Sequence, residues 1–258
     1  MNIYNIASIL TIITNLGMTL YILLRNFKHT VNRTFGLMAF TLALWGISVT
    51  HFTNIPRDQY NTAFFWWKIG YSAVIFTPIL YTHFVISYLN IKKTFFLMLG
   101  YGLSFLFFIL NWFYPRSFLG ELTFIFDKFY CVDWFKNKNI AWLLFYINAN
   151  FILAGYSFFL LLKHFRHTLG IIRNQMKYII LGSILGWVGA ESYYLLAFRV
   201  YTKLIPIFSN FFIAFYPFIF LVAIIKYRLL DIRVAITRAG LFIAVYTIVL
   251  GLPFGIAF

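Results

Sequence analysis

The sequence predicts an all-α membrane protein, a polytopic helical bundle of seven spans followed by an eighth C-terminal span. Hydrophobic residues make up 62% of the 258 residues and charged residues only 10%, against about 25% charged residues in an ordinary soluble domain. Apolar runs of about 20 residues recur along the chain, which is the length a helix needs to cross a bilayer. The alternating runs of about 10 residues that indicate a membrane β-barrel are absent from the sequence.

The first four spans are predicted at residues 5–24, 35–51, 61–89 and 95–113. The first carries the most polar side chains of the set, so we expect it to face other helices as well as lipid. The third contains Pro78, which predicts a kink.

The fifth, sixth and seventh spans are predicted at residues 140–162, 178–198 and 205–225. The fifth carries two asparagines near its middle, which favour pairing with another helix. The sixth carries three glycines that allow a neighbouring helix to come close. The seventh is uncharged over about 30 Å of helix. The three glycines of the sixth span are Gly182, Gly186 and Gly189.

The end of the chain carries a further apolar run, residues 240–258, with no charge in it. We therefore divide the chain into a seven-helix transmembrane domain, residues 1–238, and the start of a further transmembrane segment, residues 239–258. Because an uncharged end is unusual in a membrane protein, we expect the sequence to be part of a longer one.

The longest connection, residues 114–139, is too apolar to remain solvated as a plain linker. We expect it to fold onto the bundle as a lid. Its large apolar side chains are Phe124, Phe126, Phe129, Tyr130, Trp134 and Phe135.

The distribution of Lys and Arg predicts the orientation of the chain in the membrane. Thirteen of the 21 basic residues follow the odd-numbered spans and seven follow the even-numbered ones. Since cytoplasmic loops carry the excess of positive charge, the N-terminus is predicted to lie outside and the odd-numbered loops inside. The net charge of +15 is therefore assigned to topology and to lipid head groups of the inner or plasma membrane, and nucleic acid is not an expected partner.

Two charged residues inside the spans are candidates for a functional pocket. Lys68 in the third span and Glu191 in the sixth are each predicted to lie about 10 Å below the outer surface. A charge in hydrocarbon is costly unless it is paired. Their equal depth therefore permits an ion pair, which is either part of a ligand site or purely structural, with Lys68 extending towards water.

Four aromatic or polar neighbours complete the predicted pocket. Trp187 and Tyr194 share the helical face of Glu191, and Tyr71 shares that of Lys68. His51, at the outer end of the second span, is a further candidate that is otherwise an interfacial residue. The expected ligand is an unknown small molecule or a signal from the membrane itself.

A basic junction follows the seventh span and is the candidate for signal coupling. The residues assigned to this role are Tyr227, Arg228, Asp231 and Arg233. The alternative role of these side chains is to anchor lipid head groups and cap a helix.

Several kinds of chemistry are excluded. The sequence contains a single cysteine and no His-Glu-x-x-His pattern, so neither a metal site nor a cofactor is predicted. A retinal protein needs a lysine in the middle of its last core helix, and residues 205–225 contain none. No serine lies in a Gly-x-Ser-x-Gly setting, and no catalytic residue is predicted.

Several motifs together resemble the seven-helix N-terminal sensor region of bacterial histidine kinases. They are the segment Asn32–Phe35, Trp45, Trp67, Pro78 and, above all, the segment Tyr227–Arg233. The resemblance covers residues 1–238 and implies a membrane sensor followed by soluble GAF and kinase domains. The chain itself contains no phosphoacceptor motif and no nucleotide-binding boxes, so enzymatic activity is expected only of a longer protein.

Three functions compete at this point. The first is a sensor that relays an external or membrane signal to a dimeric cytoplasmic kinase, with the protein as a homodimer. The second is a small secondary transporter, suggested by the in-span proline, glycines and acid. The third is a lipid-interacting membrane protein that binds no ligand.

Overall fold

The computed structural model describes residues 3–200, 202, 204–227 and 229. The predicted eighth span at 240–258 and the boundary after residue 238 lie outside these residues. The elements, in order, are α1 (Ile3–Asn26), α2 (Thr30–Phe52), α3 (Tyr60–Tyr88), α4 (Thr94–Phe113), α5 (Pro115–Phe118), β1 (Leu122–Ile125), β2 (Phe129–Val132), α6 (Trp134–Asn137), α7 (Ile140–Ile147), the π-helix η1 (Asn148–Gly155), α8 (Tyr156–His167), α9 (Gly170–Ala197) and α10 (Ile205–Tyr227).

The prediction of seven spans is confirmed, because seven described helices are long and apolar enough to cross a membrane. The fifth of them, Ile140–His167, is a continuous rod made of α7, η1 and α8. Two helices begin at least five residues earlier than predicted, α2 at Thr30 and α9 at Gly170. The basic loop expected before residue 178 is largely helical, because α9 begins at Gly170, and its basic side chains there remain exposed on the helix surface.

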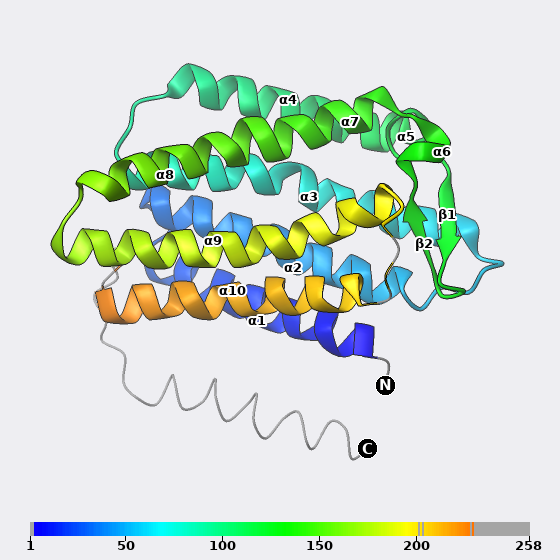
Figure 1. The fold of residues 1–258 in the computed structure, drawn as a ribbon, viewed down its shortest axis with the longest axis horizontal. Coiled ribbons are helices and arrows are strands. Elements are labelled where there is room, and N and C mark those ends of the chain that lie inside the picture. The colour runs from blue at the N-terminus through cyan, green and yellow to red at the C-terminus, as the bar shows by residue number, and fades with distance from the viewer. Residues whose placement is uncertain (1–2, 201, 203, 228, 230–258) are drawn as a thin grey trace, which may run out of the picture.

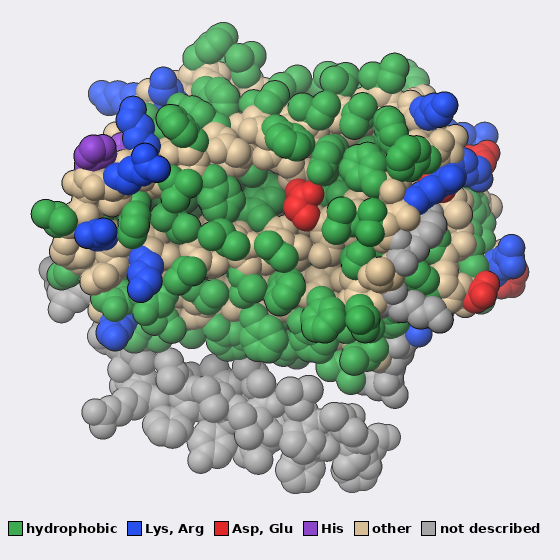
Figure 2. All heavy atoms as spheres, in the orientation of Figure 1, with side chains coloured by type: hydrophobic (Ala, Val, Ile, Leu, Met, Phe, Trp, Pro, Cys, Tyr) green, Lys and Arg blue, Asp and Glu red, His purple; other side chains and the backbone are tan. Residues whose placement is uncertain are grey.

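The helices form a closed ring. α3 packs on α2, α2 on α1, α1 on α10 and α10 on α9, and the rod of η1 and α8 closes the ring against α9 and α3. α4 lies outside the ring against α3, with large apolar side chains such as Phe95 and Met98 exposed. Figure 2 shows Lys and Arg gathered at the two ends of the molecule and hydrophobic side chains between them, the pattern of a membrane-embedded surface.

Polar side chains of α1 join it to its neighbours, as expected for the most polar span. Thr11 donates from Oγ1 to the carbonyl of Asn210 at 2.8 Å, and Thr19 donates to the carbonyl of Gly36 at 3.2 Å. The predicted close approach at the glycines of α9 is also present. A Cβ added at Gly189 would stand 2.8 Å from the carbonyl oxygen of Ser209 in α10, so no larger residue fits without a shift of the backbone.

The connection 114–139 folds onto one end of the bundle, as the lid expectation required, but it contains a β-hairpin that was not predicted. β1 and β2 pair antiparallel, with Leu122 opposite Val132 and Ile125 opposite Phe129. All four residues of β2 are buried. Trp67 of α3 donates from Nε1 to the carbonyl of Tyr130 at 2.8 Å and so ties the hairpin to the bundle.

The two ends of the molecule differ in what they carry. Figure 1 places the N-terminus, α5, α6 and the hairpin at one end. The α1–α2, α3–α4 and α8–α9 connections and the end of α10 lie at the other. We call these the hairpin end and the exit end.

Candidate functional site

A hollow lies inside the helical ring next to the hairpin. We call the part that adjoins the hairpin its upper part. The upper part has a volume of about 50 Å³ and is lined almost entirely by apolar and aromatic side chains. α2, α3, α9 and α10 supply the walls, and Cys131 and Val132 of β2 supply the roof. The aromatic lining residues are Trp45, Trp67, Tyr71, Trp187, Tyr193 and Tyr194.

The aromatic side chains are fixed by edge-to-face contacts and hydrogen bonds. The rings of Trp45 and Tyr193 meet at 89° with their centroids 4.9 Å apart. Asn210 donates to the hydroxyl of Tyr193 at 2.8 Å, and Trp142 donates to the hydroxyl of Tyr71 at 2.7 Å. Such contacts hold rings in one orientation, so the upper part of the hollow is a preformed aromatic site.

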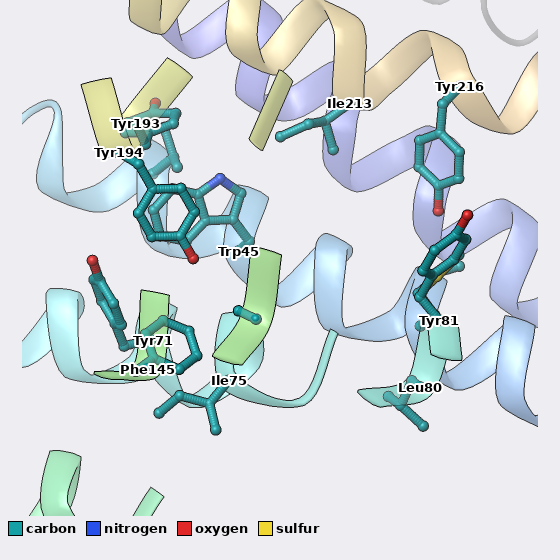
Figure 3. Packing of buried hydrophobic residues seen from close by; sticks show 14 of the residues in the cluster. Trp45, Tyr71, Ile75, Leu80, Tyr81, Phe145, Tyr193, Tyr194, Ile213 and Tyr216 are labelled. Atoms are coloured by element: carbon teal, nitrogen blue, oxygen red, sulfur yellow. The ribbon is translucent and has the colours of Figure 1, made fainter. Parts of the chain in front are cut away.

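The hollow continues towards the exit end as a lower part of about 50 Å³. The two parts share Leu42, Thr77, Trp187 and Ala190 as lining residues, so they adjoin. Figure 3 shows Trp45, Tyr193 and Tyr194 grouped at one place in this core and Tyr81 and Tyr216 at another. The lower part is also lined by Ser183, Gly186 and Phe220.

The predicted ion pair between Lys68 and Glu191 is wrong. Neither residue takes part in the salt bridges found among the described residues. Lys68 instead places Nζ 4.4 Å from the ring centroid of Trp112 in α4. Glu191 accepts a hydrogen bond of 3.2 Å from the hydroxyl of Tyr146 in α7. The two charges therefore contact different helices, α4 and α7, because equal depth does not determine the direction in which a helix presents a side chain.

Of the other four predicted pocket residues, three line the hollow and one does not. Tyr71, Trp187 and Tyr194 line the hollow. His51 does not, because it is exposed and its ring stacks on that of Trp66 at a centroid distance of 3.7 Å. Three of the six predicted residues thus come together around one cavity.

An ion pair fastens the lid at the hairpin end. Arg199, just beyond the end of α9, donates from Nε to both carboxylate oxygens of Asp133 at 3.0 and 3.1 Å. The backbone N–H of Lys136 and the hydroxyl of Thr123 also donate to Asp133, at 3.0 and 3.3 Å. Burial raises the pKa of Asp133, but the hydrogen bonds from Arg199 and Lys136 outweigh it and hold the pKa below its ordinary value.

A second hydrogen-bonded cluster joins three helices at the exit end. Gln175 of α9 donates from Nε2 to the carbonyl of Tyr227, the last residue of α10, at 2.7 Å. The hydroxyl of Tyr88, at the end of α3, donates to Oε1 of Gln175 at 3.0 Å. The rings of Tyr178 and Tyr227 lie 5.3 Å apart. We call these four residues the exit clamp. The other predicted coupling residues, Arg228, Asp231 and Arg233, lie outside the described residues.

A family model described as the N-terminal 7TM region of histidine kinase matches residues 7–233. The chain belongs to this family. The match extends over nearly all of the seven described spans. A search of the curated proteins and a search of the solved structures each gave no match.

Membership of the 7TM histidine kinase family establishes two points. The chain is a multi-pass membrane protein, and it corresponds to the sensor region of a histidine kinase, which is not the catalytic part. The seven helices and the aromatic hollow are thus the membrane part of a sensing protein.

Sequence reasoning missed most of the residues around the hollow of this 7TM region. The charged residues Lys68 and Glu191, on which the predicted pocket depended, do not line the hollow, whose lining residues are mainly aromatic and small. The overlooked signal is a stripe on α9 that repeats every three or four residues. The stripe runs through Ser183, Gly186, Trp187, Ala190 and Tyr194.

Proposed function

We propose that this chain is the signal-input module of a two-component sensor histidine kinase. In this proposal a change in the hollow moves α10 relative to α3 and α9, and the movement reaches a cytoplasmic kinase beyond the junction. The family match supports the sensor role. Tyr71, Trp187 and Tyr194 remain in the proposal as signal-binding residues because they line the hollow.

The observation that carries the proposal is that one helix contacts both the hollow and the exit clamp. Ile213 and Tyr216 of α10 line the hollow, and the same helix ends at Tyr227 in the clamp. Pro217 lies between these points. A proline interrupts the hydrogen bonds of a helix and permits bending there, so the two halves of α10 can change their relative angle.

The exit clamp supports a relay because it links three helices that also form walls of the hollow. Tyr88 belongs to α3, Gln175 to α9 and Tyr227 to α10. A shift of any one helix at the hollow therefore changes the geometry of the hydrogen bonds at Gln175. Arg228, Asp231 and Arg233 are proposed to carry this change onward.

We also propose an orientation of the chain in the membrane and a set of partners for the protein. The N-terminus and the hairpin end face the outside, and the exit end, where Lys92, Lys93 and Lys226 lie, faces the cytoplasm. The partners are the lipid bilayer, a small molecule or membrane signal, and cytoplasmic GAF and kinase domains. A second copy of the chain completes a homodimer.

The test has two parts. The coding sequence downstream of Phe258 is first read for a kinase in the same frame. The full-length protein is then placed in nanodiscs, and transfer of labelled phosphate from ATP is measured. Replacing Gln175 with leucine removes both hydrogen bonds of the clamp, so we expect kinase activity to change several-fold while the protein remains folded.

Asn174→Leu is the matched control, because Asn174 is the exposed neighbour of Gln175 on the same helix. We expect it to leave the activity at the wild-type level. An open reading frame without a kinase would overturn the proposal. So would a kinase whose activity is the same in the wild type and in Gln175→Leu.

A further inference from the structure

Three buried hydroxyl groups surround the lower part of the hollow without hydrogen-bond partners. They belong to Tyr81 of α3, Ser183 of α9 and Tyr216 of α10, whose exposed fractions are 2%, 4% and 2%. None of the three oxygens has a hydrogen-bond partner within the described residues. The side chains of Ser183 and Tyr81 are close enough for a weak hydrogen bond with each other, although their contact falls short of good hydrogen-bond geometry.

The three hydroxyl-bearing residues border the same space. All three residues line the lower part of the hollow. Figure 3 shows the hydroxyl groups of Tyr81 and Tyr216 pointing towards each other from α3 and α10. Another hydroxyl on the same wall, that of Thr77, is paired with Thr41 at 2.9 Å. Among the described residues that line the hollow, Tyr81, Ser183 and Tyr216 are the ones with a buried, unpaired hydroxyl group.

Unpaired hydroxyls are costly in a hydrocarbon environment, and buried polar groups without partners call for a bound molecule. The upper part of the hollow adds an aromatic lining directly next to them. No Asp, Glu, Lys, Arg or His of the described residues lines either part. The site therefore combines an apolar compartment with a small group of neutral hydrogen-bonding sites.

We propose that the hollow binds a small, neutral amphipathic molecule that has an apolar body and one hydroxyl or carbonyl group. The apolar body occupies the aromatic upper part, and the oxygen pairs with Tyr81, Ser183 and Tyr216. A charged ligand is disfavoured because nothing in the lining compensates its charge. The two adjoining parts of about 50 Å³ each suit a small molecule rather than a whole lipid.

This inference rests on the proposed sensor function only for its biological meaning, since binding itself is measured without a kinase. The chain is placed in phosphatidylcholine nanodiscs, and fluorine NMR follows 4-fluorobenzyl alcohol, 4-fluorotoluene and 4-fluorobenzoate. The three probes share one ring and differ in the group attached to it. Empty nanodiscs correct for partition into lipid.

The alcohol is expected to bind saturably and about tenfold more tightly than the toluene, the effect of about one net hydrogen bond. The benzoate is expected to show no saturable binding. In the double variant Ser183→Ala with Tyr216→Phe, which leaves only the Tyr81 hydroxyl, binding of the alcohol should weaken towards the affinity of the toluene, whose own binding stays the same. Ser192→Ala is the control, because the Ser192 hydroxyl bonds only to Val188 of its own helix, at 2.9 Å.

Three results would overturn the inference. One is the absence of saturable binding by both neutral probes, which leaves ordered water as the partner of the hydroxyls. Another is tighter binding of the benzoate than of the alcohol. The third is an unchanged preference for the alcohol in the double variant, with Tyr81→Phe as the substitute if that variant does not fold.

Binding without a kinase response refutes the proposed function alone, and a kinase response to Gln175→Leu without binding refutes this inference alone.

Discussion

Pro217 has no N–H group, so the carbonyl of Ile213, four residues earlier in α10, lacks its usual helical hydrogen bond. Asn15 of α1 donates from Nδ2 to this carbonyl at 3.2 Å. One turn away, Thr11 donates to the carbonyl of Asn210 at 2.8 Å. At the scale of residues, polar groups of α1 thus hold α10 where its own hydrogen bonding is interrupted.

Thr11→Val tests this role, because valine has the shape of threonine and lacks the hydroxyl. We expect the free energy of unfolding to fall by about 0.5–1 kcal/mol, the usual value of a hydrogen bond between membrane helices. Unfolding by sodium dodecyl sulfate in mixed micelles provides the measurement. Thr14→Val is the control, since the partners of Thr14 within the described part of the chain are carbonyls of its own helix. An equal loss in both variants would show that the α1–α10 bond adds no stability.

Three of the residues predicted for the site lie together in the structure. Tyr71 shares a helical face with Lys68, and Trp187 and Tyr194 share one with Glu191; all three aromatic residues line the hollow. Lys68 and Glu191 do not line the hollow. Residues three or four positions apart share a helical face only broadly, so a small rotation of the helix can turn one of them into the hollow and the other away from it. The rotation of each helix about its axis depends on its neighbours, and a single sequence does not contain that information.

At the scale of elements, the hairpin shows what the sequence concealed. A half-buried strand alternates polar and apolar residues, but β2 is buried at all four positions and shows no such pattern. The turn between β1 and β2 places Phe126 and Asp127 at φ of 57° and 53°, and it contains no glycine that would have indicated a hairpin turn in the sequence. The π-helix Asn148–Gly155 was not predicted either. The fifth span contains no proline, so its sequence showed no sign of a departure from the α-helix. The long helices were predictable because hydrophobic length alone determines them.

The ion pair between Asp133 and Arg199 is expected to keep the hairpin closed over the hollow. Cys131 reports on this closure, because it is the single cysteine of the sequence and is buried. Arg199→Gln should increase the rate at which 4,4′-dithiodipyridine labels Cys131 several-fold at pH 7, since the buried carboxylate then lacks its cation. Lys136→Gln is the control. It removes only the exposed pair of Lys136 with Glu121, and such pairs contribute little.

The same experiment has a pH dependence of known sign. The pKa of Asp133 is lower in the folded protein than its ordinary value. Its stabilising effect is therefore complete above the unfolded pKa of about 3.9 and is lost as the pH falls through the folded pKa. In the wild type, labelling of Cys131 should rise as the pH is lowered below about 4. The labelling rate of Arg199→Gln should change much less over this range, and equal pH profiles would contradict the assignment.

At the scale of the whole molecule, hydropathy predicted how many helices cross the membrane but not which ones are neighbours. The hollow lies between α2, α3, α9 and α10, inside the ring that the rod of η1 and α8 closes. Close packing at Gly189 and the hydrogen bonds of α1 determine that ring. These are contacts between distant parts of the chain, and the order of the spans does not reveal them.

The proposed direction of signalling requires that the hairpin end faces outwards. Arg57 and Lys92 lie beyond opposite ends of α3, and both are exposed. In a Cys131→Ser background, a membrane-impermeant maleimide should label Arg57→Cys in intact spheroplasts and label Lys92→Cys only after permeabilisation. The physical reason is the excess of basic residues in the connections at the exit end, which are retained on the cytoplasmic side. The opposite labelling would place Tyr227 outside the cell, where α10 has no path to a cytoplasmic kinase.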